Sequence, residues 1–100
     1  MDKAKRSDFI FCVGYEGETA LVDGSMAKTH AAYTTMQLAE AGLYRAACAS
    51  AILSDDKTEI DAFVAYYNKI AGLSISTKEE LTKLFGVSVS DFIGKKIRVL

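Results

Sequence analysis

The sequence predicts a small α+β protein with an N-terminal β-hairpin, three or four short helices and a C-terminal strand that returns to the sheet. Three observations support this class. β-Branched and aromatic residues cluster near the N-terminus, helical periodicity begins near Thr34, and polar and apolar residues alternate again after Lys95. The expected order of elements is therefore β-β-α-α-α-α-β.

The hairpin is expected to pair residues 8–15 with residues 19–22. Phe, Ile, Val and Cys fill the first segment, and Gly17 lies in the turn, where glycine adopts positive φ without a steric penalty. The stretch 25–33 fits either a third strand or a short helix over 26–31. We favour the helix.

Three capping boxes predict where later helices begin. In each box, a hydroxyl or carboxylate side chain precedes Glu or Gln by three residues, so that the two side chains satisfy each other's backbone N–H groups. The three pairs are Thr34 with Gln37, Asp56 with Glu59, and Ser76 with Glu79. Glycines that suit the left-handed conformation after a helix predict where these helices end, at Gly42, Gly72 and Gly86.

The last five residues, Lys96-Ile97-Arg98-Val99-Leu100, alternate polar and apolar side chains. This alternation is typical of a half-buried strand. An isolated hairpin is marginally stable in water, and a third strand would stabilise it. We therefore expect this segment to join the hairpin.

Length and composition indicate one globular domain over residues 8–100, preceded by a flexible tail at 1–7. Half of the 100 residues are apolar, a quarter are charged, and the net charge is −1. A nearly neutral chain has no strong field to attract nucleic acid or an anionic membrane. No run of apolar residues approaches the roughly 20 that a membrane span needs. We expect no membrane association and a cytoplasmic location.

Few residues in the chain could carry out catalysis. His30 is the single histidine, and the two cysteines, Cys12 and Cys48, lie in apolar or alanine-rich surroundings that are typical of core positions. No glycine-rich phosphate loop is present, and although Ser25 and Lys28 have the S-x-x-K spacing of penicillin-binding proteins, the other motifs of that family are absent. We expect no catalytic residues, no enzymatic activity and no cofactor.

One acidic cluster could in principle hold a hard cation, and it comprises Asp55, Asp56, Glu59 and Asp61. These acids also begin a predicted helix, where negative charge offsets the positive end of the helix dipole. We favour the capping role. The two cysteines and the histidine lack the spacing of a zinc site, so no metal site is expected.

Segment 77–93 resembles the helix-turn-helix of bacterial repressors. Gly86 falls on the turn glycine of that family, and apolar residues fall at its core positions, namely Leu81, Leu84, Phe85, Val87 and Phe92. The resemblance implies a recognition helix over 88–95 and binding to DNA. Phosphate contacts would come from Lys95, Lys96 and Arg98, with help from the tail residues Lys3, Lys5 and Arg6.

A second hypothesis is that the chain binds another protein or a second copy of itself. Helix 43–53 is rich in small residues, which let another backbone approach closely, so Ala47 and Ala51 are candidate partner contacts. Tyr66 is a third candidate, because its neighbour Tyr67 occupies the apolar stripe and an exposed tyrosine suits an interface.

We favour the interaction module over the DNA-binding alternative. Arg, Lys, Asn and Gln are the usual readers of base edges, and none of them lies between Ser88 and Gly94. The sequence thus predicts a non-catalytic protein-interaction or self-association module, with a helix-turn-helix-like DNA-binding domain as the alternative.

Overall fold

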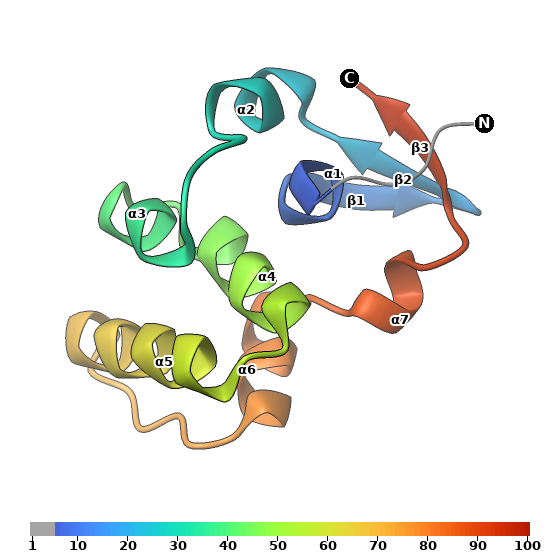
Figure 1. The fold of residues 1–100 in the computed structure, drawn as a ribbon. Coiled ribbons are helices and arrows are strands. Elements are labelled where there is room, and N and C mark those ends of the chain that lie inside the picture. Colours follow the sequence, from blue (N-terminus) through green and yellow to red (C-terminus); the bar gives the residue numbers. More distant parts are fainter. Residues whose placement is uncertain (1–5) are drawn as a thin grey trace. The chain divides into compact units, whose positions relative to one another are not determined.

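The computed structural model describes residues 6–100, apart from the side chain of Asp91, and has the α+β class that the sequence predicts (Figure 1). The basic tail residues Lys3 and Lys5 lie outside the described residues. The elements in chain order are α1 (Arg6–Ile10), β1 (Cys12–Glu16), β2 (Thr19–Val22), α2 (Gly24–Thr29), α3 (Thr35–Glu40), α4 (Tyr44–Ser54), α5 (Lys57–Ala71), α6 (Lys78–Phe85), α7 (Val89–Phe92) and β3 (Lys96–Val99).

The chain divides into two compact units, which are described separately. Of the described residues, the sheet unit comprises 6–32 and 88–100, and it contains the three described strands. The helical unit comprises residues 33–87. That residues 8–100 form one domain stays a prediction.

The sheet unit is built on a three-stranded sheet in the order β1-β2-β3. β1 and β2 form the predicted antiparallel hairpin, and the C-terminal strand β3 pairs with β2 in the parallel direction. The prediction that the C-terminal strand returns to the hairpin is therefore confirmed. β2 is the central strand and contributes two fully buried residues, Ala20 and Val22.

The N-terminal segment differs from its prediction. The strand expected from residue 8 begins at Cys12, and residues before it form helix α1. A strand would send neighbouring side chains to opposite faces, whereas both Phe9 and Ile10 are buried, and one helical turn allows this. The Phe9 ring also packs edge-on against Phe92, with 5.1 Å between the ring centroids.

The ambiguous stretch after the hairpin is helical, as we favoured. Helix α2 begins two residues earlier than expected, because the Asp23 carboxylate caps it by accepting a hydrogen bond from the Met26 N–H (3.1 Å). Gly24, the first residue of α2, lies against Val99 of β3, and a Cβ atom at Gly24 would overlap the Val99 side chain. This close approach joins α2 to the outer strand of the sheet.

The capping boxes locate helix starts in the helical unit with differing accuracy. The box at Thr34 and Gln37 is confirmed, since each side chain accepts from the other's backbone N–H. Asp56 caps α5 through the Thr58 N–H, but Glu59 does not complete that box. The predicted glycine stops at Gly42, Gly72 and Gly86 all take positive φ just after their helices.

The third box is shifted by one residue. Thr77, rather than Ser76, caps α6, and its partner is Glu80 rather than Glu79. Ser76 instead adds its own backbone and hydroxyl hydrogen bonds to the Glu80 carboxylate. These bonds, first from Ser76 and then from Thr77, lower the pKa of Glu80 because they favour its charged form.

Helix α4 is the centre of the helical unit and is in contact with α3, α5 and α6. Its residues 46–52 are all buried, which small side chains permit by allowing close helix approach. Four aromatic rings, with neighbouring centroids 5.0–6.0 Å apart, bridge α4, α5 and α6, and they belong to Tyr44, Phe63, Tyr67 and Phe85.

A buried polar network ties three helices of this unit together. Thr35 Oγ1 donates to Glu59 Oε1 at 2.6 Å and lies 2.7 Å from Ser50 Oγ. Since Thr35 has one hydroxyl proton and gives it to Glu59, Ser50 is the donor in the second bond. This explains why Glu59 leaves its predicted capping box: it accepts from a buried hydroxyl instead.

We predict that Thr35→Val lowers the free energy of unfolding by about 2 kcal/mol, because it removes a hydrogen bond to a charged acceptor and leaves the Ser50 hydroxyl without that partner. Urea unfolding followed by circular dichroism measures this. Thr58→Val makes the same change at an exposed helical position and should stay within about 0.5 kcal/mol of the parent. Equal effects of the two substitutions would contradict the role of the network.

We also predict that Gly24→Ala destabilises the protein by about 1 kcal/mol, because the new methyl group overlaps Val99. The same substitution at Gly14, where a Cβ meets nothing within 4 Å, is the matched control and should cost less. In a Val99→Ala background the penalty at Gly24 should largely disappear, which a double-mutant cycle in urea detects. An unchanged penalty would show that the contact with Val99 is not its cause.

Candidate functional site

The outer edge of β3 is the candidate site. β3 pairs with β2 on one side only, and no described strand covers its other side (Figure 1). The N–H groups of Lys96 and Leu100 donate to the β2 side, to Glu18 O (2.9 Å) and Val22 O (2.8 Å). Successive N–H groups of a strand point to opposite edges, so those of Ile97 and Val99 point to the open edge.

The side chains of β3 divide into two faces of the sheet. Ile97 and Val99 pair with the buried residues Ala20 and Val22 and therefore share their apolar face. Lys96 and Arg98 alternate with them and lie on the opposite face. The strand thus presents one basic and one apolar row along an open edge.

Large apolar side chains are exposed around this strand. Val99 is 61 % exposed, Leu100, which follows it, 63 %, and Ile93, in the turn before it, 71 %. An exposed apolar group gains free energy when a partner removes it from water. The edge therefore offers both backbone groups and apolar surface to a second chain.

The three basic residues of the predicted DNA contact differ in their surroundings. Lys95 is only 22 % exposed in its side chain, forms an ion pair with Glu18 (3.7 Å) and lies over the Tyr15 ring at 5.8 Å. Lys96 and Arg98 are exposed and form no ion pair with any side chain that the structure describes. Only these two keep their charge available to a partner.

The opposite edge of the sheet, formed by β1, is less regular. Its register with β2 shifts between Cys12 and Gly14, which marks a bulge around Val13. Bulges disrupt the ladder and commonly protect an edge from pairing with another chain. β3, whose register is continuous from Lys96 to Val99, is the more receptive edge.

The structure places the predicted partner contacts of α4 in the core. Ala47 and Ala51 are fully buried, so their small side chains serve packing within the chain and are closed to a partner in this conformation. Tyr66, on α5, is half-buried. The two alanines are therefore not part of the candidate site at the β3 edge. The exposed apolar residues near β3 were not predicted as partner contacts from the sequence.

The expected recognition helix over 88–95 is shorter in the structure. α7 spans only Val89–Phe92, and Gly94, with φ of +85°, takes the chain out of the helix before β3 begins. One helical turn leaves little length to lie along a groove of DNA. Residues 93–95, predicted to lie in that helix, instead connect α7 to β3, and Lys96–Val99 form the strand that their alternation predicts.

The nucleophile candidates are held in structural roles. Cys12 is buried and its thiol donates to Gly14 O at 3.3 Å, while His30 Nδ1 lies 2.9 Å from Met26 O and its ring packs near Phe11. Cys48 is buried in the helical unit, and burial raises the pKa of its thiol from 9.0 to about 12, opposed in part by Arg45. A protonated thiol is a poor nucleophile.

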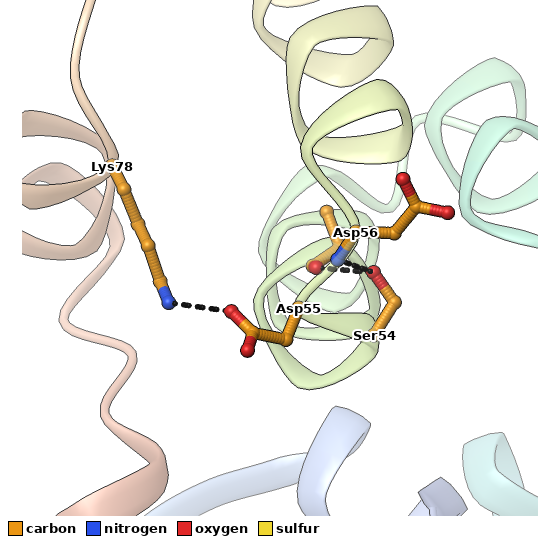
Figure 2. A network of polar contacts seen from close by, with 5 residues as sticks. Ser54, Asp55, Asp56 and Lys78 are labelled. Carbon is orange, nitrogen blue, oxygen red and sulfur yellow. Dashed lines mark hydrogen bonds and ion pairs between the residues drawn. The ribbon is translucent and has the colours of Figure 1, made fainter.

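Two acids of the cluster, Asp55 and Asp61, line a pocket of about 300 Å³ in the helical unit, together with Lys57, Ile60, Ser76 and Lys78. Figure 2 shows Lys78 reaching Asp55 (3.2 Å) beside Ser54 and Asp56 at the corner between α4 and α5. Lys57 pairs with Asp61 at 2.6 Å. Each carboxylate that lines the pocket has an ammonium partner, so the pocket has no uncompensated charge to select an ionic ligand.

The described part of the chain contains no group of three or more His, Cys, Asp or Glu side chains arranged to hold a metal ion. Among its helices, none combines the length and the apolar character needed to cross a bilayer. Comparisons with protein-family models, with curated sequences and with solved structures find no match.

We predict that Cys48 reacts with a thiol reagent at least about 10³-fold more slowly in the native protein at pH 8 than in denaturant, because the raised pKa removes the thiolate by about that factor and the buried sulfur is closed to the reagent. A Cys12→Ala variant isolates the Cys48 signal, and absorbance of the released chromophore measures the rate. Fast, stoichiometric labelling of the folded variant would reverse this assignment and reopen a role in catalysis.

Proposed function

We propose that this chain is a non-catalytic protein-interaction module that binds an extended segment of a partner protein along the open edge of β3. The observation that carries the proposal is the pair of backbone groups at Ile97 and Val99 that point away from β2, flanked by exposed apolar side chains. Strand addition of this kind uses main-chain hydrogen bonds for affinity and alternate side chains for specificity.

The apolar row of β3 supports the same proposal. Ile97 and Val99 lie at the margin of the buried face that Ala20 and Val22 occupy. Neighbouring strands are about 4.8 Å apart, so apolar side chains of an added strand would lie directly beside this row. Such a strand would continue the buried face outward and would cover Val99.

The surroundings of the reactive groups support a role without catalysis. General-base and nucleophile chemistry needs an activated side chain in an accessible position. Cys12 and Cys48 are buried, and His30 directs Nδ1 to a main-chain carbonyl. None of the three lies on β3.

Site-specific photo-cross-linking tests the proposal in the cells that naturally make the protein. A photoreactive phenylalanine replaces Leu100, which is exposed and adjacent to the edge, while the control carries it at the exposed Lys69 of α5. We expect one defined protein adduct from position 100 and none from position 69. Equal adducts at both positions, or none at 100, would overturn the proposal.

A proline substitution separates strand addition from other modes of binding. Val99→Pro removes an N–H that points to the open edge and leaves the N–H donors to β2 in place. Val99→Ala shortens the side chain but keeps the N–H. We predict that the adduct from position 100 falls at least tenfold with proline and persists with alanine, provided that urea unfolding shows both variants folded. Equal yields would exclude pairing through this edge.

A further inference from the structure

We infer that the segment that pairs with β3 is an acidic one, in which Asp or Glu alternates with apolar residues, and that it is not a second copy of this chain. The inference rests on the proposed strand addition and specifies the chemistry of the partner. It is carried by the two-row pattern of β3 and by the charges of Lys96 and Arg98, which have no ion-pair partner among the described side chains.

The geometry of strand pairing determines which side chains meet. Residues directly opposite each other on neighbouring strands point to the same face, with Cβ atoms about 4.5–5.5 Å apart. A partner strand beside β3 therefore places every second side chain next to Lys96 and Arg98, and the intervening ones next to Ile97 and Val99. Opposite charges are favourable in the first row, and apolar groups are favourable in the second.

The charges of Lys96 and Arg98 are available for this pairing. Across the sheet on the same face, Lys96 pairs with Thr19 and Arg98 with Leu21, neither of which is charged. The acid on that face is Glu16 of β1, paired with Thr19 and hence two strands from Lys96. That separation is about 10 Å, close to the screening length in physiological salt, so Glu16 compensates the basic row weakly.

The same row opposes pairing with a second β3. Two copies related by a twofold axis pair in antiparallel fashion. Because Ile97 and Val99 carry the backbone groups at the open edge, each hydrogen-bonded pair joins one of these residues to one of the same two residues in the other copy. Two such registers overlap most of the strand. In the register centred on Ile97, Arg98 of one copy lies opposite Lys96 of the other. In the register centred on Arg98, the two Arg98 side chains lie opposite each other. Like charges directly opposite each other are destabilising.

The β1 edge of a second copy is also a poor match. It offers a single acid, Glu16, at one end of the strand, and the bulge at Val13 interrupts the ladder. An acidic, alternating segment of another protein satisfies both rows of β3, whereas neither edge of the described sheet does.

Two synthetic peptides test the inference directly. Both are end-capped heptapeptides in which four Val or Thr residues alternate with three charged residues. The Val and Thr residues are the same in both peptides, and the charged residues are all Glu in one and all Lys in the other. Amide hydrogen exchange by NMR reports pairing at the edge. We expect the Glu peptide to slow exchange of the Ile97 and Val99 amides at least tenfold and the Lys peptide to leave them unchanged.

Charge reversal supplies the matched control. The double variant Lys96→Glu with Arg98→Glu should lose protection by the Glu peptide and gain it from the Lys peptide. Lys69→Glu with Lys83→Glu changes the net charge equally at exposed helical positions and should behave as the parent. All four residues are exposed, and urea unfolding verifies that each variant folds.

The outcomes distinguish this inference from the proposed function. In one outcome, the cross-link to another protein is lost with Val99→Pro, but the two peptides protect the Ile97 and Val99 amides equally or not at all. This result overturns the inference of an acidic partner and leaves the proposed strand addition in place. An adduct whose mass is twice that of the chain overturns the inference in favour of a second copy. Loss of the position-specific adduct itself overturns both.

Discussion

The sheet unit depends on the pairing of β2 along both of its edges. β2 is four residues long and contributes the fully buried Ala20 and Val22, so its backbone groups must find partners inside the sheet. β1 supplies one set of partners through a tight hairpin, and β3 supplies the other from the far end of the sequence. Half of the backbone groups of β3 bond to β2, and the other half are left at the open edge of the sheet. The proposed partner would bind at this edge.

Local sequence rules predicted much of this fold. Residues whose side chains bond to nearby backbone, such as Thr34 and Asp56, indicated where helices begin, and Gly72 and Gly86 indicated where helices end. These features depend on neighbours within a few residues, so the sequence alone contains them. The one-residue shift at Thr77 occurs where two adjacent hydroxyl residues both donate to the same carboxylate, Glu80.

Features that depend on distant residues were not predictable in the same way. Helix α1 was predicted as strand because a short apolar run has no decisive period, and its burial is shared with Phe92 far along the chain. Glu59 leaves its local box for Thr35, in an earlier helix. For the candidate site, the alternation from Lys96 to Val99 predicted a strand, but which of its edges stays open follows from its pairing with β2.

The parallel pairing of β2 with β3 has a consequence for the order of folding. Thr19 and Lys96 are partners, yet most of the chain separates them, and contacts of such separation form slowly because a long loop must close first. A folded helical unit shortens the flexible part of that loop and so lowers the entropy lost on closure. The hairpin and the helices can thus assemble before β3 joins them. A ligand that binds β3 in the folded protein, and not in the unfolded chain, would stabilise this long-range pairing by mass action.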